Sequence, residues 1–319
     1  MAVYTAVSEA ALARFLAEYA LGPGGRLSPI AEGVENSNFL LETAAGRYIL
    51  TLYERRVEAR ELPWFLGLME HLAARGITCP QPVRGRDGAS LRALCGRPAC
   101  ITTFLPGAWP RRIAVGHCEA VGGALARLHL AGASYGAVRA NALGPGGWPA
   151  LLAQCGVAAD GVAPGLYGEL AAALGHVEAA WPEGLPRGQI HADLFPDNAF
   201  FQGSELTGLI DFYFAATDLL AYDLAVCVNA WCFAEGVATR LVLGRRRALL
   251  GGYEAVRPLG PAERAALPVL CQGAALRFLL TRLHDWLHTP AGALVTRKDP
   301  LAYLARLRYF LAEEMAHAG

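Results

Sequence analysis

Apolar residues in the first hundred positions alternate between helical and strand-like spacing. A first helix is predicted where four apolar side chains recur at intervals of three and four behind a serine that can cap it: Ser8, Leu12, Phe15, Leu16 and Tyr19. The Gly/Pro-rich segment 21–29 predicts a connector, and the runs 38–43 and 47–53 predict a hairpin. A second helix is predicted after Pro63, and short strands over 79–83 and 99–104. This part is expected to be a small α+β lobe.

Helical spacing dominates after Pro106-Gly107. Helices are predicted over 117–130, 218–234, 245–253, 261–288 and 300–317, with short strands over 189–198 and 206–214 that end in polar residues. The pattern predicts two lobes, residues 1–105 and residues 106–319. The expected fold class is α+β, with an antiparallel sheet in the small N-terminal lobe and a larger, mainly helical C-terminal lobe.

Composition narrows the class of protein. The chain has 319 residues, of which 54% are hydrophobic and 18% charged, and this excludes a disordered chain. The 28 basic and 28 acidic residues balance, so the sequence predicts no nucleic-acid partner, no membrane surface and no obligate protein partner. The eight cysteines are scattered, which predicts reduced thiols. Charged residues interrupt both the N-terminal segment and the apolar stretches, so the sequence predicts a cytoplasmic protein. The single lysine, Lys298, follows an arginine, which excludes a Gly-Lys-Ser/Thr phosphate-binding loop.

Polar residues gather beside two predicted strands, in His191-Ala192-Asp193-Leu194-Phe195-Pro196-Asp197-Asn198 and in Ile210-Asp211-Phe212. The spacing from Asp193 to Asn198, with Asp211 behind them, is that of the catalytic loop and metal-binding motif of protein kinases. In that arrangement the first Asp orients the acceptor hydroxyl or takes its proton. The Asn and the second Asp hold Mg²⁺ through hard oxygen ligands. The sequence therefore predicts phosphoryl transfer, with Asp193 as catalytic residue and Asn198 and Asp211 as metal ligands.

Two other motifs carry less chemistry. Gly132-Ala133-Ser134-Tyr135-Gly136 matches the nucleophile elbow of α/β-hydrolases, but a helix precedes it where that motif needs a strand, so a turn is expected. His284 and His288 stand four residues apart and could share a metal. No third ligand of similar spacing accompanies them, which favours packing or solvent contact.

The chain resembles the aminoglycoside/choline kinase superfamily, whose fold is like that of protein kinases, and within it the homoserine kinases. The stretches that carry the resemblance are 32–38, 48–54, 191–198, 208–214, 221–225, 229–233 and 277–282. The resemblance implies ATP-dependent phosphorylation of the side-chain hydroxyl of L-homoserine, a small-molecule substrate, on the way to threonine. ATP and Mg²⁺ are the cofactors that it implies.

Individual roles follow from the same resemblance. Asp193, Asn198 and Asp211 match the catalytic Asp and the magnesium ligands, and Asp223 matches a buried Asp that supports the catalytic loop. The residues that match the loop over the phosphates and the adenine-binding hinge are Gly33, Asn36, Ser37, Asn38, Thr103 and Leu105. The first lobe is thereby expected to bind the nucleotide, and the second to carry catalysis and the substrate.

The chain departs from the wider superfamily at the position of the residue that binds the phosphates of ATP. Thr51 stands where most members of the superfamily have a phosphate-binding Lys, and Phe65 stands near the position of that lysine's Glu partner. Arg55 or Arg56 could supply the cation instead. The missing lysine leaves open a catalytically silent nucleotide-binding protein, although the intact Asp193 argues against it.

The substrate pocket is less defined by the sequence. An amino-acid substrate needs an acid and a guanidinium, and the candidates are Arg139, Arg277, Arg282 and Asp285. Each is as compatible with a surface ion pair as with a ligand. A kinase for choline or for an aminoglycoside stays open as an alternative; choline would favour an aromatic cage, and an aminoglycoside an acidic cleft.

Overall fold

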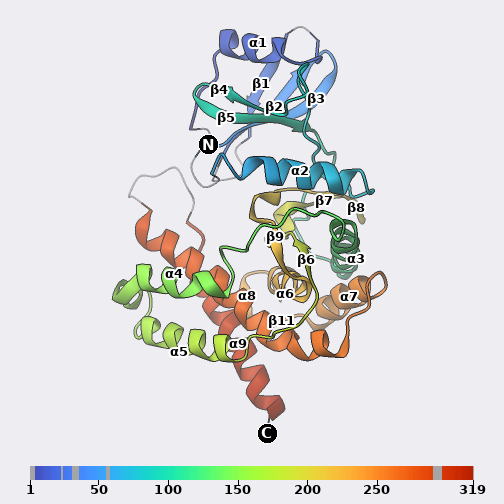
Figure 1. Ribbon diagram of the computed structural model, residues 1–319. Coiled ribbons are helices and arrows are strands. Elements are labelled where there is room, and N and C mark those ends of the chain that lie inside the picture. The colour runs from blue at the N-terminus through green and yellow to red at the C-terminus, as the bar shows by residue number, and fades with distance from the viewer. Residues whose placement is uncertain (1–3, 23, 31–35, 55–57, 290–296, 319) are drawn as a thin grey trace. The chain divides into compact units, whose positions relative to one another are not determined.

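The computed structural model describes all residues except 1–3, 23, 31–35, 55–57, 290–296 and 319 (Figure 1). The chain divides into two compact units. The described residues of the first unit lie within 1–107 and 207–213. Those of the second lie within 108–206, 214–289 and 297–318.

An antiparallel sheet and two helices form the first unit. The five strands lie in the order β1 (Arg26–Pro29), β2 (Ser37–Thr43), β3 (Gly46–Leu52), β5 (Arg97–Thr103) and β4 (Leu91–Leu94). The helices are α1 (Glu9–Ala17) and α2 (Leu62–Ala73). Ser8 caps α1 by accepting the Ala11 N–H, and a proline stands in the first turn of α2.

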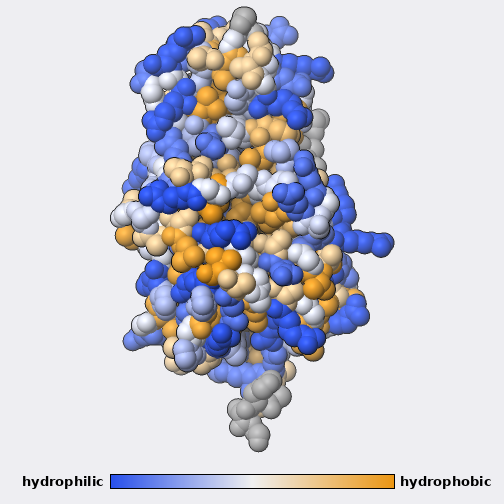
Figure 2. All heavy atoms as spheres, turned by 90° about the vertical axis from the view of Figure 1, so that its right-hand side faces the viewer, coloured by the Kyte–Doolittle hydropathy of each residue, from blue (hydrophilic) through white to orange (hydrophobic). Residues whose placement is uncertain are grey.

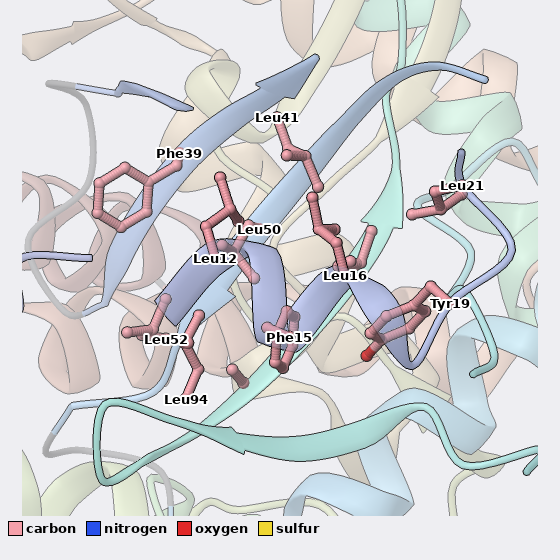
Figure 3. Packing of buried hydrophobic residues seen from close by; sticks show 12 residues of the cluster. Leu12, Phe15, Leu16, Tyr19, Leu21, Phe39, Leu41, Leu50, Leu52 and Leu94 are labelled. Atoms are coloured by element: carbon pink, nitrogen blue, oxygen red, sulfur yellow. The ribbon is translucent and has the colours of Figure 1, made fainter. Parts of the chain in front are cut away.

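The hydrophobic core of this unit lies between α1 and the sheet (Figure 3). Leu12, Phe15 and Leu16 lie on one side of α1 and point at Leu41 and Leu50, which are completely buried on β2 and β3. The apolar side chains on one face of α1 therefore pack against the apolar side chains on one face of the sheet.

Seven helices dominate the described part of the second unit. They are α3 (Val115–Gly132), α4 (Trp148–Cys155), α5 (Leu166–Ala179), α6 (Leu220–Trp231), α7 (Leu243–Glu254), α8 (Pro261–His288) and α9 (Leu301–Ala318). Short two-stranded sheets pair β6 (Arg187–Ile190) with β9 (Ala216–Leu219) and β10 (Phe233–Ala234) with β11 (Val237–Leu241). A third pair joins β7 (Ala199–Gln202) to β8 (Glu205–Leu209), whose residues from Thr207 onward are counted with the first unit. Helix α8 packs on α6 and α9, and α3 packs on α7.

Helices α3 and α7 approach each other closely because glycines stand at their crossing. A Cβ on Gly122 of α3 would lie 2.0 Å from the Leu249 carbonyl oxygen, and one on Gly252 of α7 would lie 2.1 Å from the Glu119 carbonyl oxygen. Any side chain there would push two backbones apart. The crossing brings Tyr253, the next residue on α7, to α3.

The structure confirms most of the predicted elements and corrects others. The predicted connector 21–29 contains β1, and segment 79–83 is no strand, since within it only Pro82 forms a bridge, to Thr102 of β5. Strand β4 and helices α4 and α5 were not predicted. The Gly132–Gly136 motif is a turn after α3, in which the Tyr135 N–H donates to the Gly132 carbonyl, so the structure gives it no nucleophile elbow.

Helix α8 is long and apolar enough to pass a test for a membrane span, but 83% of its most apolar window is buried inside the protein. Such burial is typical of the core helix of a folded domain. On the face drawn in Figure 2, hydrophobic and hydrophilic residues are interspersed.

We expect the α3–α7 crossing to be intolerant of even one methyl group. Gly252→Ala should lower the free energy of unfolding by about 1–3 kcal/mol, since backbone atoms must move. Gly251→Ala is the matched control: nothing lies within 4 Å of its Cβ, so it should stabilise α7 by about 0.5–1 kcal/mol. Urea unfolding of both variants measures the difference, and equal effects would contradict the proposed steric role.

Candidate active site

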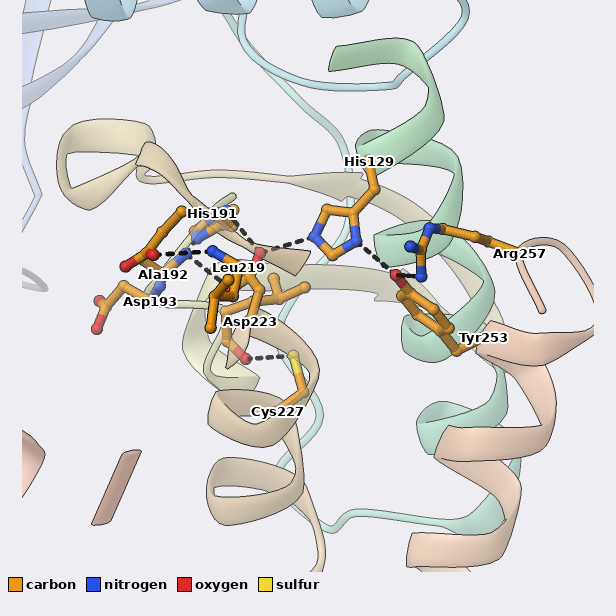
Figure 4. Close-up of polar contacts among 11 residues, drawn as sticks. His129, His191, Ala192, Asp193, Leu219, Asp223, Cys227, Tyr253 and Arg257 are labelled. Atoms are coloured by element: carbon orange, nitrogen blue, oxygen red, sulfur yellow. Dashed lines mark hydrogen bonds and ion pairs between the residues drawn. The ribbon is translucent and has the colours of Figure 1, made fainter. Parts of the chain in front are cut away.

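The predicted catalytic loop follows β6 in the second unit and has a left-handed backbone at Ala192, with φ of 62°. A residue with a Cβ pays about 1–2 kcal/mol for that conformation, so its surroundings must hold it there. The buried carboxylate of Asp223 on α6 does so (Figure 4). It accepts the His191 N–H at 2.7 Å through Oδ2 and the Ala192 N–H at 2.8 Å through Oδ1.

Side chains from neighbouring elements fix the carbonyl groups of the same loop. Arg277 of α8 donates to the Ala192 carbonyl, and Trp231 of α6 donates its indole N–H to the Leu194 carbonyl at 2.8 Å. Asn198 donates its amide to the Asp193 carbonyl at 2.7 Å and to that residue's carboxylate at 3.3 Å. The backbone on both sides of the half-buried Asp193 is therefore fixed before any substrate binds.

A hydrogen-bonded chain runs from Asp223 away from the loop. His129 of α3 lies 3.1 Å from Asp223 through Nε2 and 2.7 Å from the Tyr253 hydroxyl through Nδ1 (Figure 4). Arg257 donates to the same hydroxyl at 3.2 Å and to Glu263 at 2.9 Å.

The direction of the bond at Asp223 follows from the carboxylate, which can only accept. His129 therefore donates its Nε2–H to Asp223, and its Nδ1 is bonded to the Tyr253 hydroxyl.

Asp223 keeps its negative charge in spite of complete burial. Burial alone would raise the pKa of this carboxyl, but the hydrogen bond from His129, the nearby His191 and the N–H groups of the loop outweigh it and hold the pKa below its usual value. A charged acceptor strengthens each of its hydrogen bonds, which is what the left-handed loop requires.

Asp211, the predicted second metal ligand, belongs to the first unit and is exposed, with a left-handed φ of 64°. Close behind it, the hydroxyl groups of Tyr213 and Tyr53 lie 2.6 Å apart, and Phe65 packs edge-on against Tyr213. The resemblance predicts the usual Glu near Phe65, and the structure shows an aromatic cluster of Tyr53, Phe65 and Tyr213 there.

The nucleotide-binding candidates in the described part of the first unit are tied to one another. Thr51 donates its hydroxyl to the Asn38 side chain at 2.8 Å, across the β2–β3 pair. The buried Ser37 hydroxyl donates to Glu54 at 2.6 Å and accepts two N–H groups of the N-terminal segment, those of Tyr4 and Thr5. Their side chains stabilise the strand, which leaves backbone groups as the means of contacting a phosphate there. Gly33, Arg55 and Arg56 lie outside the described residues.

The predicted hinge follows β5. The Thr103 hydroxyl accepts the Gln81 N–H at 3.0 Å, and its own N–H donates to the Gln81 carbonyl at 2.9 Å. The Leu105 side chain packs where a Cβ on Gly208 would lie, at 2.7 Å. These contacts fix the backbone of 103–105 from both sides.

Comparison with known proteins agrees with this geometry. The model of the phosphotransferase enzyme family matches residues 26–259. The chain belongs to this family. It is 64% identical over 318 residues to a homoserine kinase of Granulibacter bethesdensis, covering 100% of this chain and 99% of the relative. It is 63% identical over 311 residues to a homoserine kinase of Acidiphilium cryptum, covering 98% and 97%. A choline kinase structure from Cryptosporidium parvum shares the fold, with a TM-score of 0.64, 13% identity and coverage of 92% and 89%.

In this phosphotransferase the candidate substrate residues have different surroundings. Arg277 is 2% exposed and bonded to the catalytic loop, and Arg139 donates to the Ala215 carbonyl at 3.0 Å beside β9. Asp285 is half-buried, with its carboxylate 3.8 Å from the imidazole of His284. Arg282 lies over the ring of Tyr303, 4.4 Å from its centroid, and the charge of Asp193 acts on it. Of the four, the structure brings Arg277 and Arg282 toward Asp193.

The donor atoms of the predicted metal ligands suit magnesium. Because the Asn198 amide nitrogen is bonded to Asp193, its oxygen is the atom left to ligate, and Asp211 offers an exposed carboxylate. Within the described residues no group of three or more His, Cys, Asp or Glu could hold a metal, and the rings of His284 and His288 stack on each other.

Sequence reasoning missed three residues of the site. They are His129, Trp231 and Tyr253, which the sequence pattern places in predicted helices without indicating a role. A histidine, a tyrosine and a tryptophan fit an apolar helix face as well as a polar contact, so their partners are visible only when the helices are packed.

Asp223 should make stability depend on pH. Because its folded-state pKa lies below the unfolded value of about 3.9, its contribution is present above pH 4 and is lost as pH falls through the folded-state value. Asp223→Asn keeps one acceptor for three donors and should cost about 3 kcal/mol near pH 7, with a shrinking difference from wild type below pH 4. Unfolding curves between pH 3 and 7 measure it, with the exposed Asp160→Asn as control. A difference that is constant with pH would contradict a charged Asp223.

Proposed function

We propose that this phosphotransferase is a homoserine kinase, which transfers the γ-phosphoryl group of ATP to the side-chain hydroxyl of L-homoserine. The observation that carries the proposal is the match over essentially the whole chain to curated homoserine kinases, at 64% and 63% identity. The fixed loop around Asp193 supports it, since a preorganised carboxylate is what an alcohol acceptor needs. It also argues against a catalytically silent protein.

In the proposed reaction Asp193 orients the homoserine hydroxyl and accepts its proton as the bond to phosphorus forms. Asn198 holds the Asp193 carboxylate and carbonyl, which limits the rotation of that side chain. Arg277 and Asp223 hold the Ala192 peptide that precedes it. The reaction is then a matter of position and charge, as in other phosphoryl transfers.

The nucleotide is assigned to the first unit, through the backbone of 33–38 over the phosphates and of 103–105 at the adenine. Asn198 and Asp211 would hold magnesium, which when bound neutralises charge on the phosphates. In place of the usual lysine we propose Arg55 or Arg56 as the phosphate cation. The enzyme would act in the cytoplasm, in threonine biosynthesis, without an obligate partner.

The substrate is tested with a panel of alcohols. We expect L-homoserine to be phosphorylated with a far higher kcat/KM than choline, kanamycin or L-serine. Serine is one methylene shorter, so its hydroxyl falls short of the phosphate when its amino and carboxylate groups are bound. Coupled measurement of ADP release gives the ranking. Faster turnover of choline or kanamycin would assign the chain to another substrate class, and no turnover of any alcohol would favour a silent nucleotide-binding protein.

Asp193→Asn tests the proposed base. The variant keeps the size of the side chain and one acceptor oxygen but loses the charge that takes the proton, so kcat should fall by about 10²-fold or more. ATP affinity should change little. The exposed Asp197→Asn, four residues further along, is the matched control and should keep its kcat. An Asp193→Asn enzyme that binds ATP and retains over a tenth of wild-type kcat would remove Asp193 from this role.

A further inference from the structure

Three buried or half-buried arginines of the second unit have no carboxylate partner among the described residues, and their helices contact the loop of Asp193 through Arg277 and Tyr303. Arg277 and Arg282 come from α8 and Arg306 from α9. Each donates one hydrogen bond to a backbone carbonyl, those of Ala192, Asp299 and Asn229. Within the described residues none of the three forms an ion pair with an Asp or Glu.

Two of these guanidinium groups lie on the same aromatic ring. The central carbon of Arg282 is 4.4 Å from the centroid of Tyr303, and that of Arg306 is 4.5 Å from it. The ring attracts each cation, but it does not cancel the repulsion between them. Burial lowers the pKa of Arg282, and the neighbouring charge of Arg306 lowers it further. Two positive charges that lie close together in a partly buried environment favour the binding of an anion.

Hydrogen-bond donors at this place lack acceptors in the described structure. The Tyr303 hydroxyl is completely buried and has no partner, and the Nε–H groups of Arg277 and Arg306 are buried without one. Burial raises the pKa of Tyr303, so its hydroxyl stays a neutral donor. Unmatched buried donors cost stability unless something else accepts their protons.

Phe195, two residues after Asp193, packs against Tyr303 with 6.4 Å between the ring centroids, and this contact ties the cluster to the loop of Asp193. In an amino acid with a hydroxyl side chain, the hydroxyl and the carboxylate are a few bonds apart. A protein group that binds the substrate's carboxylate must therefore lie near Asp193, whose own carboxylate faces the substrate's hydroxyl.

We propose that Arg282 and Arg306, together with the hydroxyl of Tyr303, bind the α-carboxylate of the amino-acid substrate. The assignment rests on the proposed function and deepens it, because it says which end of the substrate these residues recognise. It predicts selection against amino alcohols that have no carboxylate, because such substrates would add a positive charge beside two uncompensated guanidinium groups. Arg277 keeps its place as the positioning residue of the Ala192 carbonyl.

The test compares L-homoserine with 3-aminopropan-1-ol, which is the same molecule without its carboxylate. For Arg282→Met and Arg306→Met we expect kcat/KM for homoserine to fall by about 10–10²-fold, mainly through KM. For aminopropanol it should not fall, because no carboxylate contact is lost and one repelling charge is removed. Arg297→Met is the matched control, since Arg297 also lies over an aromatic ring, that of Trp286, and donates to a carbonyl, but is exposed; it should change neither substrate.

A second measurement needs no turnover. L-2-Aminobutyrate has the carboxylate and lacks the hydroxyl, so it should inhibit wild type competitively and should lose about 10-fold or more in affinity in the two Met variants. Arg282→Lys, which keeps the charge, should lose less. These values remain measurable even where aminopropanol is a poor substrate.

The outcomes separate the two proposals. A wild-type enzyme that phosphorylates no homoserine overturns the proposed function. A wild type that phosphorylates it, but whose Met variants lose both substrates equally, overturns the carboxylate site and points to a role toward the transferred phosphate or in folding. Unchanged inhibition by L-2-aminobutyrate overturns the site as well.

Discussion

In the second unit of this phosphotransferase, the backbone of the loop that carries Asp193 depends on a single buried carboxylate. Asp223 accepts two backbone N–H groups from consecutive residues of the catalytic loop and thereby holds Ala192 in a left-handed conformation. Without a charged acceptor that backbone would relax toward an ordinary conformation, and Asp193 would turn with it. The hydrogen bonds to the buried Asp223 thus offset the conformational energy of the left-handed Ala192. Asp223 in turn stays ionised because of the groups that surround it.

The support for that charge extends through α3 and α7. His129 of α3 donates to Asp223, the Tyr253 hydroxyl of α7 bonds the other nitrogen of the same imidazole, and Arg257 donates to that hydroxyl. The glycines at the α3–α7 crossing allow this chain to exist, because a wider crossing would separate the imidazole from the hydroxyl. Packing and electrostatics are thus coupled: the hydrogen bond between His129 and Tyr253 forms only because the backbones of α3 and α7 approach each other closely.

Neutral side chains interlock in the first unit. Thr51 donates its hydroxyl to Asn38 across the β2–β3 pair, and Tyr53, Phe65 and Tyr213 form an aromatic cluster. This cluster packs beside the segment that carries Asp211. The cation that we propose for the phosphates is an arginine, in keeping with a chain in which only one of 28 basic residues is a lysine.

Local patterns in the sequence determined much of this protein. Helical spacing predicted α1, α2, α3 and α8, strand spacing predicted the β2–β3 hairpin, and the separation of Asp193, Asn198 and Asp211 predicted the chemistry. These features depend on neighbours along the chain, where periodicity and motif spacing carry information. Strand β4 and the partners of the predicted catalytic loop other than Asp223 were decided only by the tertiary structure. A short edge strand is stabilised by its pairing with β5, and Trp231, His129 and Tyr253 act through contacts between residues that are 37, 94 and 124 positions apart. A side chain that can pack or donate equally well takes its role from whatever the fold places beside it.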